Sequence, residues 1–532
     1  MTDPRQHYTG ILKETWGDRL SVEPGVAPNE LYLNLNPRYT GSVSEICLAL
    51  VHSFKARLVT LVPVDEQSTK GFLYVQYVFS VAHDDLFLIL RLSVDPRHME
   101  IPSIATHIEA ANWFERELKD WFGIIAFPNI YKLASHPDWP EDVHPMLKDF
   151  AIDQNVPRVK GDFEFKPVEG EGIFEIPVGP VHAGIIEPGH FRFSVAGEPI
   201  INLDAQLFYT HKGTEKLAEG MDPERAVFLA ERISGDTSFG HALAFCHAIE
   251  RLGQIEVPEC ALVGRTILLE LERLYNHVGD IGAIMLDVGY GVGASMASRL
   301  KEQILHANEV LTGSRLLRGM AAIGGLRRPF SDAAPKTKTL HSITTTWRKS
   351  FEELIDVAMS SSSTLDRLET TGQLSHKEAY RLGIIGIAGR ASGIDRDLRR
   401  DHPHCSYRSL PFKPALYEEG DVFARFNVRI DEVRQGIAIL EQLEKQLSGG
   451  PLRTSVGTIA LGTCALGYVE AWRGEVVHWV STDDSGKIAR WKITDPSFRN
   501  WRGVLAAVRN NIVPDFPVIN KSFNLSYSGN DR

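Results

Sequence analysis

Residues 231–252, ERISGDTSFGHALAFCHAIERL, decide how the rest of this sequence is interpreted. A run of small and polar residues at 234–238 comes directly before a stretch in which apolar residues recur every three or four positions, namely Phe239, Leu243, Cys246, Ile249 and Leu252. This spacing places the apolar side chains along one face of a helix. We therefore expect a polar loop that opens a buried helix.

The chain around this stretch has 532 residues, which favours about two to four domains. Hydrophobic residues make up 43% and charged residues 23%, as in packed globular proteins. The net charge of −11 gives no electrostatic reason to expect nucleic acid as a partner. No segment reaches the roughly 20 apolar residues of a membrane helix, and residues 1–10 do not form a signal peptide. We expect no direct membrane span.

The five cysteines are scattered and form no Cys-x-x-Cys pair. This argues against a disulfide framework and against a zinc or iron–sulfur site held by this chain alone. We expect buried thiols that behave as small hydrophobic groups.

Local patterns divide the chain into three parts. Short runs rich in β-branched and aromatic residues predict strands at 56–65, 72–81 and 86–95, and helix-like stretches at 45–54 and 108–122 complete an α+β domain over 1–150. A charged segment with Gly and Pro, 151–172, is predicted to be a linker. The second domain, 173–532, begins with a predicted hairpin, continues as long helices and becomes β-rich again from 461. The predicted fold is multidomain: an α+β domain, then a mainly α-helical bundle with small β-sheets at its start and end.

Two segments carry a resemblance to a known family. The 231–252 stretch resembles the segment of nickel-iron hydrogenase large subunits in which a Cys-Gly-x-Cys loop opens the same helix, and residues 521–532, KSFNLSYSGNDR, resemble the second ligand pair near the C-terminus. Ser234, Thr237, Ser526 and Gly529 occupy the four cysteine positions. A nickel–iron centre needs thiolates, whereas hydroxyls stay protonated and glycine has no side chain. The resemblance therefore implies a hydrogenase-like scaffold with degenerate ligand positions and no metal, as in the forty-nine-kilodalton-type subunit of respiratory complex I.

The N-terminal part is similar to a second complex I subunit. The strings ANWFERELKDWFGI at 111–124 and HPDWPEDVHPM at 136–146 resemble the signature of the thirty-kilodalton-type subunit. The order of the two modules in one polypeptide is most similar to large subunits of group 4 hydrogenases and formate hydrogenlyases.

The complex I resemblance also implies candidate site residues. In those relatives the loop that corresponds to 179–190 presents a histidine to a quinone; His182 matches it, and His190 is a second candidate. A neutral imidazole can donate a hydrogen bond or a proton to a quinone. Complex I supplies its other donor from a tyrosine where this chain has Gly235, so Asp236, Thr237 or His241 would have to substitute. We take His182 and Asp236 as catalytic candidates.

Alternatives remain open at several positions. His182 would otherwise be a structural loop residue, and Asp236 would cap the helix that begins near Ser238. The secondary candidates are His211, Glu215 and Arg473. Lys212, Glu215 and Lys216 would otherwise form solvated ion pairs on one helical turn. Arg473, which keeps an arginine that lies over the iron ligands in hydrogenases, would pair with a carboxylate or simply pack.

Two charged stretches of the sequence also allow two interpretations each. Glu270, Arg273 and His277 recur on one helix face, which would either line the bundle interior or form an exposed salt-bridge face. Arg390, Asp395, Arg396 and Asp397 would lie on a wet surface or on a face that meets an iron–sulfur partner.

Three functions follow from the resemblance. The first is a non-hydrogenase subunit of a membrane-associated complex I-like oxidoreductase, which binds no cofactor itself and contributes to a quinone or other electron-acceptor site. The second is an inactive structural subunit that bridges electron-transfer and membrane modules, and the least favoured is a nickel-iron hydrogenase. The implied partners are an iron–sulfur small subunit of the complex I twenty-kilodalton type, a ferredoxin-like subunit and membrane ion-pumping subunits. They imply a peripheral position on the cytoplasmic side of the inner membrane.

Overall fold

The computed structural model describes residues 4–532 except 162, 164, 166–167, 183–185, 331–335 and 448. Its N-terminal part is a five-stranded sheet with the strand order β1-β2-β5-β4-β3, in which only the β2–β5 pair is parallel. The elements are α1 (Pro4–Trp16), β1 (Leu20–Pro24), β2 (Glu30–Leu35), α2 (Val43–Ser53), β3 (Arg57–Glu66), β4 (Phe72–Val81), β5 (Leu86–Val94) and α4 (Asn112–Phe122). The three strands predicted at 56–95 are β3, β4 and β5.

The sheet is buried on both faces. One face packs with α1, α2 and α4 into the main hydrophobic core, and the other contributes Tyr32, Val59, Val62, Val64, Val78, Phe87 and Ile89 to a separate apolar cluster. That second cluster also contains Leu466, Tyr468, Val477 and Trp479 from the far end of the chain. Because alternate residues of a strand point to opposite faces, strands that are apolar at nearly every position require partners on both sides.

The second part of the chain begins and ends with small sheets. The first contains β8 (Ile173–Val178), β9 (His190–Ala196) and β10 (Ile200–Gln206), and the last contains β13 (Cys464–Ala471), β14 (Gly474–Thr482) and β15 (Ile488–Thr494). Between them lie α5 (Thr214–Leu217), α6 (Pro223–Ala230), α7 (Ser238–Leu252), α8 (Glu259–Asp287), α9 (Gly291–Thr312), α11 (Arg348–Met359), α14 (Gly386–Ala391), α15 (Leu398–Asp401) and α16 (Val422–Glu444). The chain closes with α17 (Pro496–Ala507), α18 (Phe516–Phe523) and α19 (Tyr527–Asp531). The predicted fold class is confirmed.

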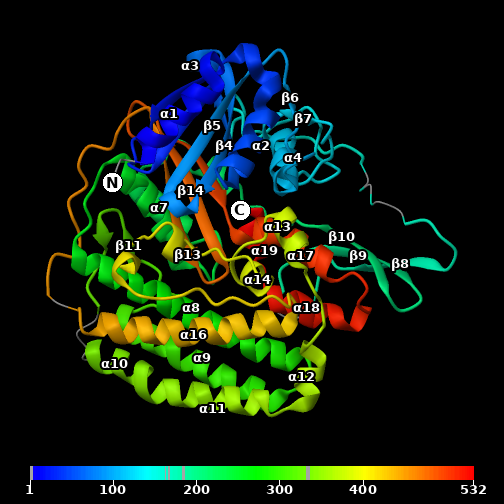
Figure 1. The fold of residues 1–532 in the computed structure, drawn as a ribbon, viewed down its shortest axis with the longest axis vertical. Coiled ribbons are helices and arrows are strands. Elements are labelled where there is room, and N and C mark those ends of the chain that lie inside the picture. Colours follow the sequence, from blue (N-terminus) through cyan, green and yellow to red (C-terminus); the bar gives the residue numbers. More distant parts are fainter. Residues whose placement is uncertain are drawn as a thin grey trace.

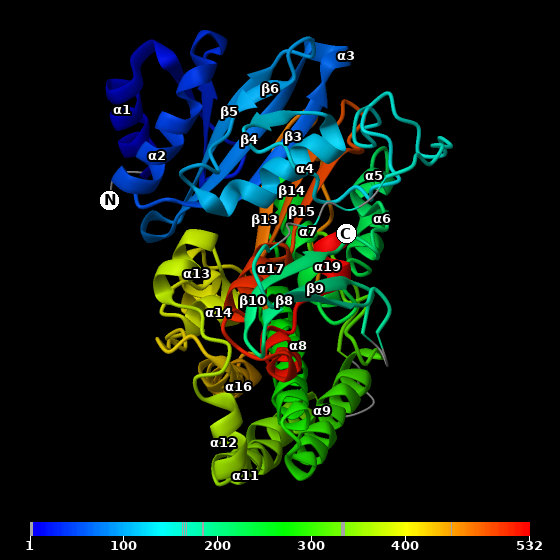
Figure 2. The same cartoon turned by 90° about the vertical axis from the view of Figure 1, so that its right-hand side faces the viewer.

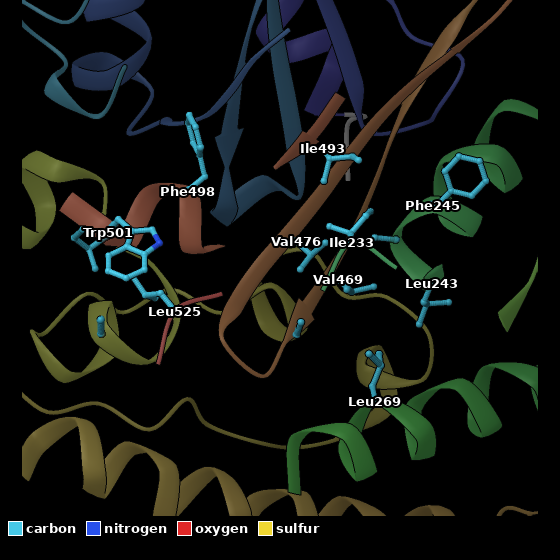
Figure 3. Close-up of a cluster of buried hydrophobic side chains, with 14 of the residues drawn as sticks. Ile233, Leu243, Phe245, Leu269, Val469, Val476, Ile493, Phe498, Trp501 and Leu525 are labelled. Atoms are coloured by element: carbon cyan, nitrogen blue, oxygen red, sulfur yellow. The ribbon is translucent and has the colours of Figure 1, made fainter. Parts of the chain in front are cut away.

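The long helices and the C-terminal sheet form successive layers. In Figure 1, α8, α16, α9 and α11 run across the lower half of the molecule, and the N-terminal sheet lies at the top. The strands β13–β15 lie between these two regions, as the view in Figure 2 also shows. Figure 3 shows Leu243 of α7 on the side of Val469 of β13, and the Phe245 ring of α7 lies 4.7 Å from that of Trp491 of β15. The residues of the apolar stripe predicted for 239–252 all belong to the main core. The face of α7 that meets β13 is formed by small residues instead, because an added Cβ at Gly467 would lie 2.9 Å from Ala248 Cβ and one at Gly240 would lie 3.3 Å from Ala471 Cβ.

In the part of the chain that the structure describes, no helix is both long enough and apolar enough to cross a membrane.

Candidate functional site

The loop before α7 and the last helix meet in the interior. The hydroxyls of Ser234 and Ser526 are 2.9 Å apart and buried, although 292 residues separate them. The backbone N–H of Gly529 donates to Ser526 Oγ at 2.8 Å, and Ser526 is the N-cap of α19. Three of the four positions that correspond to cysteines in hydrogenases therefore lie in direct contact.

Asp236 joins the fourth position to this cluster. Its Oδ1 accepts hydrogen bonds from Ser234 Oγ at 2.8 Å and from Thr237 Oγ1 at 3.1 Å. The Arg473 guanidinium donates to both carboxylate oxygens, at 2.7 and 2.6 Å. Burial alone would raise the pKa of Asp236, but Arg473 outweighs it and holds this pKa at about 2. Asp236 is therefore an anion at neutral pH, and of the two alternatives for Arg473, pairing with a carboxylate is confirmed.

The cap alternative for Asp236 is wrong. The N-cap of α7 is Thr237, and no side chain caps the helix there, because the Asp236 carboxylate is turned toward Arg473. About 39% of the Asp236 side chain is exposed, so water screens the ion pair on one side. The site thus presents a fixed anion at its surface, and the cation that holds it, Arg473, is buried behind it with only 4% of its side chain exposed.

The backbone of the loop is held as firmly as its side chains. The carbonyl oxygen of Asp236 accepts hydrogen bonds from Asn276 Nδ2 at 2.8 Å and from Tyr275 Oη and Trp472 Nε1 at 3.1 Å. Trp472 Nε1 also lies 3.1 Å from Thr237 Oγ1. The Trp472 indole thus fixes the loop at both the Asp236 carbonyl and the Thr237 hydroxyl.

His241 lies deeper than the loop. Its Nε2 is 2.9 Å from Asp495 Oδ2, its Nδ1 is 3.0 Å from His478 Nε2, and none of its surface is exposed. Both ring nitrogens are thus engaged in the interior.

The donor set at this site does not fit a nickel–iron pair. The side chains at the four positions are two serines, a threonine and a glycine, and neither hydroxyls nor a bare backbone replace bridging thiolates. A Cβ added at Gly529 would lie 2.7 Å from the carboxylate of Asp495. The Asp495 carboxylate therefore occupies the space into which a side chain at position 529 would extend.

Sequence reasoning missed Glu272, a buried acid beside the loop. Glu272 lies on α8, and its two carboxylate oxygens accept from the backbone N–H groups of Phe239 and Gly240 at 2.8 and 3.0 Å, in the first turn of α7. Burial raises the pKa of Glu272 to about 8, against the opposing effect of these two hydrogen bonds. The sequence gives little sign of this role, because Glu272 lies next to Glu270, Arg273 and His277 on a helix with many charged residues.

Arg318 was also missed. At Gly235, where complex I relatives carry a tyrosine, the atom nearest to an added Cβ is Arg318 Nη2 at 3.6 Å. Arg318 Nε also donates to Ser238 Oγ at 3.4 Å, and the side chain is otherwise exposed. A guanidinium therefore lies beside Gly235, and it is a donor that the expected substitutes, Asp236, Thr237 and His241, did not include.

The loop 179–190 docks on α19, and residues 183–185 within it lie outside the described part. Glu187 accepts from the backbone N–H of Ser528 at 3.0 Å, and an added Cβ at Gly189 would lie 2.6 Å from the Tyr527 ring. His182 Nε2 lies 2.7 Å from the carbonyl oxygen of Gly189. His190 Nδ1 is 3.3 Å from the carbonyl oxygen of Gly179. Both histidines thus contact the backbone of their own loop. That loop contacts α19, and Ser234 contacts Ser526, the N-cap of the same helix.

His211 and Glu215 lie apart from the Asp236 cluster, at the junction of the two parts of the chain. His211 Nδ1 is 2.6 Å from the carbonyl oxygen of Asp531, and its ring stacks on Trp121 of α4 at 5.0 Å. Glu215 is buried and pairs with Arg490 at 2.8 Å, with further contacts to Lys492 and Arg532. The alternative of solvated ion pairs on one helical turn is therefore wrong for Glu215. Both residues line a cavity of about 290 Å³.

Comparison with known proteins places this arrangement in a family. Residues 40–156 match the family described as "Respiratory-chain NADH dehydrogenase, 30 Kd subunit", and residues 287–465 and 462–532 match "Respiratory-chain NADH dehydrogenase, 49 Kd subunit". Formate hydrogenlyase subunit 5 of Escherichia coli K12 is 34% identical over 99% of this chain and 93% of its own length. Hydrogenase-4 component G of the same organism is 36% identical over 88% of this chain and 82% of its own length.

A solved structure shows the same fold. A chain from the membrane-bound sulfane sulfur reductase (MBS), described as an archaeal respiratory membrane complex, aligns over all of its own length and 69% of this chain, with a TM-score of 0.64 and 25% identity. On the identity and coverage of the two curated relatives, the chain belongs to the family of formate hydrogenlyase subunit 5 and hydrogenase-4 component G, as a fusion of parts that match the two complex I subunits.

Proposed function

We propose that this chain is the non-hydrogenase large subunit of a membrane-associated oxidoreductase complex and that it forms part of an electron-acceptor site. The observation that carries the proposal is the Asp236–Arg473 pair, which is held among Ser234, Thr237 and Ser526 where hydrogenases place thiolates. This arrangement offers fixed charges and hydroxyls but no soft ligands, so it suits an organic or sulfur acceptor better than a metal pair.

The acceptor would be a quinone or sulfane sulfur. A quinone that takes up two electrons also takes up two protons, and it needs hydrogen-bond donors at its carbonyl oxygens. His182 and Arg318 are the candidate donors: the first lies on the loop that docks on α19, and the second stands over Gly235. For His182 Nε2 to donate to an acceptor, its contact with Gly189 would have to break. Sulfane sulfur is the second candidate, because the MBS chain shares this fold and an exposed guanidinium suits an anionic polysulfide.

The partners would hold the redox centres. An iron–sulfur small subunit of the complex I twenty-kilodalton type would deliver electrons to the acceptor, a ferredoxin-like subunit would supply them, and membrane ion-pumping subunits would anchor the assembly. This chain would then lie peripherally on the cytoplasmic side of the membrane. The kinship with subunits of formate hydrogenlyase and of a respiratory membrane complex supports this arrangement.

The test is turnover of the purified complex with a short-chain quinone and, separately, with polysulfide. We expect His182→Ala to slow the reduction of a quinone by about tenfold or more, as the loss of a positioned proton donor does, and Arg318→Ala to weaken acceptor binding. His306→Ala is the matched control, because His306 is 72% exposed on α9. Unchanged turnover in both variants would favour the purely structural role, and stoichiometric nickel in the complex would overturn the proposal.

A further inference from the structure

A second cluster of charged residues lies behind the candidate site, and it is almost completely buried. Its members are no more than 2% exposed and come from α8, α14, α15, the segment before α15, α16 and β13; they are Glu270, Arg273, His277, Arg390, Asp397, Arg399, Glu432 and Glu470. The interior alternative for the Glu270 face is thus confirmed. The surface alternative for residues 390–397 is wrong for Arg390 and Asp397, whereas the Asp395 side chain is 56% exposed.

The charges in this cluster do not balance. Four carboxylates face three guanidiniums, so one negative charge is uncompensated when every acid is ionised. Protonated His277 would balance it, but burial lowers the pKa of that imidazole. An uncompensated charge in the interior costs far more free energy than a neutral acid. We therefore expect one of the four carboxylates to bind a proton.

Glu470 is the acid with the least compensation. Glu432 is contacted by three partners: Arg390 at 2.6 Å, His277 at 2.8 Å and Arg273 at 3.1 Å. Asp397 has a two-point contact with Arg399 at 2.7 and 3.0 Å. Glu270 is contacted by Arg273 at 3.3 Å, by Arg399 at 3.5 Å and by the Tyr407 hydroxyl. Among the residues that the structure describes, Glu470 has only the shared Arg390 at 2.8 Å and the backbone N–H of Leu398 at 3.0 Å.

Burial and the surrounding charges together oppose the ionisation of Glu470. Burial, and then the Asp397 carboxylate, raise the pKa of Glu470 to about 7 against the effect of Arg390. Glu270 and Glu432 add negative charge from α8 and α16, and Arg273 and Arg399 add positive charge. Across the strand pair lies Glu475, whose own charge is met by Arg57, with Arg499 nearby.

A small polar cavity separates Glu470 from an open groove at the surface. Glu470, Asp397, Glu475, Arg396 and Asp401 line a cavity of about 10 Å³, which approaches the volume that one water molecule needs. Arg396 and Asp401 also line an open groove of about 650 Å³, which contains His83 and His376. The two spaces share these side chains, so Arg396 and Asp401 lie between the open groove and the small cavity beside Glu470.

The cluster also touches the candidate site. The His277 ring lies 6.1 Å from the Trp472 ring, and Trp472 donates to the Asp236 carbonyl. Arg273 donates to the backbone carbonyls of Glu470 and Ala471, just before Arg473 in the chain. A change of charge near Asp236 is therefore felt at Glu470 through a water-poor interior.

We propose that Glu470, with Arg390, Asp397 and Glu432 around it, is a proton-loading site that exchanges one proton with solvent past Asp401. The step is the protonation of the Glu470 carboxylate to a neutral carboxylic acid and its reverse, with no other bond made or broken. The proton site depends on the buried cluster alone, whereas its use during acceptor reduction rests on the proposed function.

Infrared difference spectroscopy of the full chain across about pH 5 to 9 tests this site. We expect two buried carboxylic acids to give carbonyl bands in this range, because Glu272 also titrates there, with a pKa of about 8. The band that titrates near pH 7 should shift in D₂O and be lost in Glu470→Gln, whereas Glu272→Gln should leave it in place. Glu475→Gln is the matched control: it removes an acid from the same cavity and should leave the band in place. An unchanged band in Glu470→Gln, or no such band in the wild-type chain, overturns the proposal.

A second variant covers the case in which Glu470→Gln does not fold. Glu470→Asp keeps the acid but shortens its reach, so a band from position 470 should shift in frequency and midpoint, whereas a band from another acid would stay unchanged and contradict the proposal. Neither readout uses acceptor turnover. The proposal of a proton site can therefore be disproved while the proposed function stands, and the proposed function can be disproved while the proton site stands.

Discussion

At the scale of single residues, the site differs from a metal centre because a few side chains fill the space and supply the charges there. Asp236 and Arg473 form a bidentate ion pair among hydroxyls, and Asp495 fills the volume beside Gly529. The sequence predicted which four positions converge, because the resemblance fixes their places along the chain. It did not predict what fills the space, because Asp495 comes from a segment outside both motifs.

The close approach of Asp495 to Gly529 gives a first prediction. Gly529→Ala should destabilise the protein by about 1–3 kcal/mol, because an added Cβ would lie 2.7 Å from a buried carboxylate. Urea unfolding measures this difference. The control is Gly10→Ala in α1, where an added Cβ meets no atom within 4 Å and helix propensity favours alanine. Equal effects of the two substitutions would contradict the packing argument.

Glu272 gives a prediction of pH dependence. Its pKa is raised to about 8 in the folded state and is about 4.3 in an unfolded chain, so the folded state binds more protons between these values. The contribution of Glu272 to the unfolding free energy is therefore greatest below about pH 4, falls as the pH rises, and levels off above about pH 8. Glu272→Gln removes this dependence, so it should gain a few kcal/mol relative to wild type between about pH 5 and 9.

Denaturant titrations of both proteins at several pH values provide the measurement for Glu272. Glu353→Gln on the exposed side of α11 is the control for the loss of a carboxylate from the surface. A pH-independent difference between wild type and Glu272→Gln would show that the buried carboxyl does not titrate in this range.

At the scale of elements, the long helices show where sequence periodicity stops being informative. Charged residues three and four positions apart look the same whether they form an exposed salt-bridge face or line the interior of a bundle. On α8 they are interior, because α16 and β13 cover that face and supply counter-charges. The spacing of charged residues specifies which side of a helix they share. The elements packed against that side determine whether it is buried or exposed.

One helix, α16, allows this difference to be measured. Arg429 is buried and pairs with Asp280 of α8 at 2.9 Å, whereas Arg434, one turn later, forms an exposed pair with Glu352 at 2.7 Å. We expect Arg429→Met to destabilise the protein by about 3–5 kcal/mol, because it leaves the Asp280 carboxylate buried without its cation. Arg434→Met should cost less than about 1 kcal/mol. Similar losses in equilibrium unfolding would mean that Asp280 finds other compensation.

At the scale of the whole molecule, the two parts of the chain form one continuous structure. The N-terminal sheet and the C-terminal strands share an apolar cluster, and charged residues join them beside it. Glu117 of α4 pairs with Lys492 of β15 at 2.6 Å and with Arg532 at 2.9 Å. Burial and the neighbouring Arg532 lower the pKa of Lys492 to about 8. The candidate site therefore lies on a frame to which both ends of the sequence contribute.

The junction gives the last prediction. Glu117→Ala should destabilise the interface by about 3–5 kcal/mol, since it leaves two buried cations, Lys492 and Arg532, with only their longer contacts to Glu215, at 3.7 and 3.5 Å. Hydrogen exchange should speed up in α4 and β15 and stay constant in α11, which lies far from the junction (Figure 1). The control is Glu109→Ala, which removes a 28% exposed carboxylate that pairs with Arg381 and Arg502 at another point of the same junction. Faster exchange in α11 as well would indicate global destabilisation instead.

The sequence by itself determined the element types, the order of the two modules and the loss of soft ligands, because these depend on local periodicity and on residue identity. The tertiary structure decided that Asp236 pairs with Arg473 and not with the helix it precedes, that Glu272 and Glu470 are buried acids, and that Arg318 stands over Gly235. The physical reason is that protonation and pairing depend on burial and on charges from other elements. Those neighbours come from segments up to hundreds of residues away, and no local pattern records which of them meet.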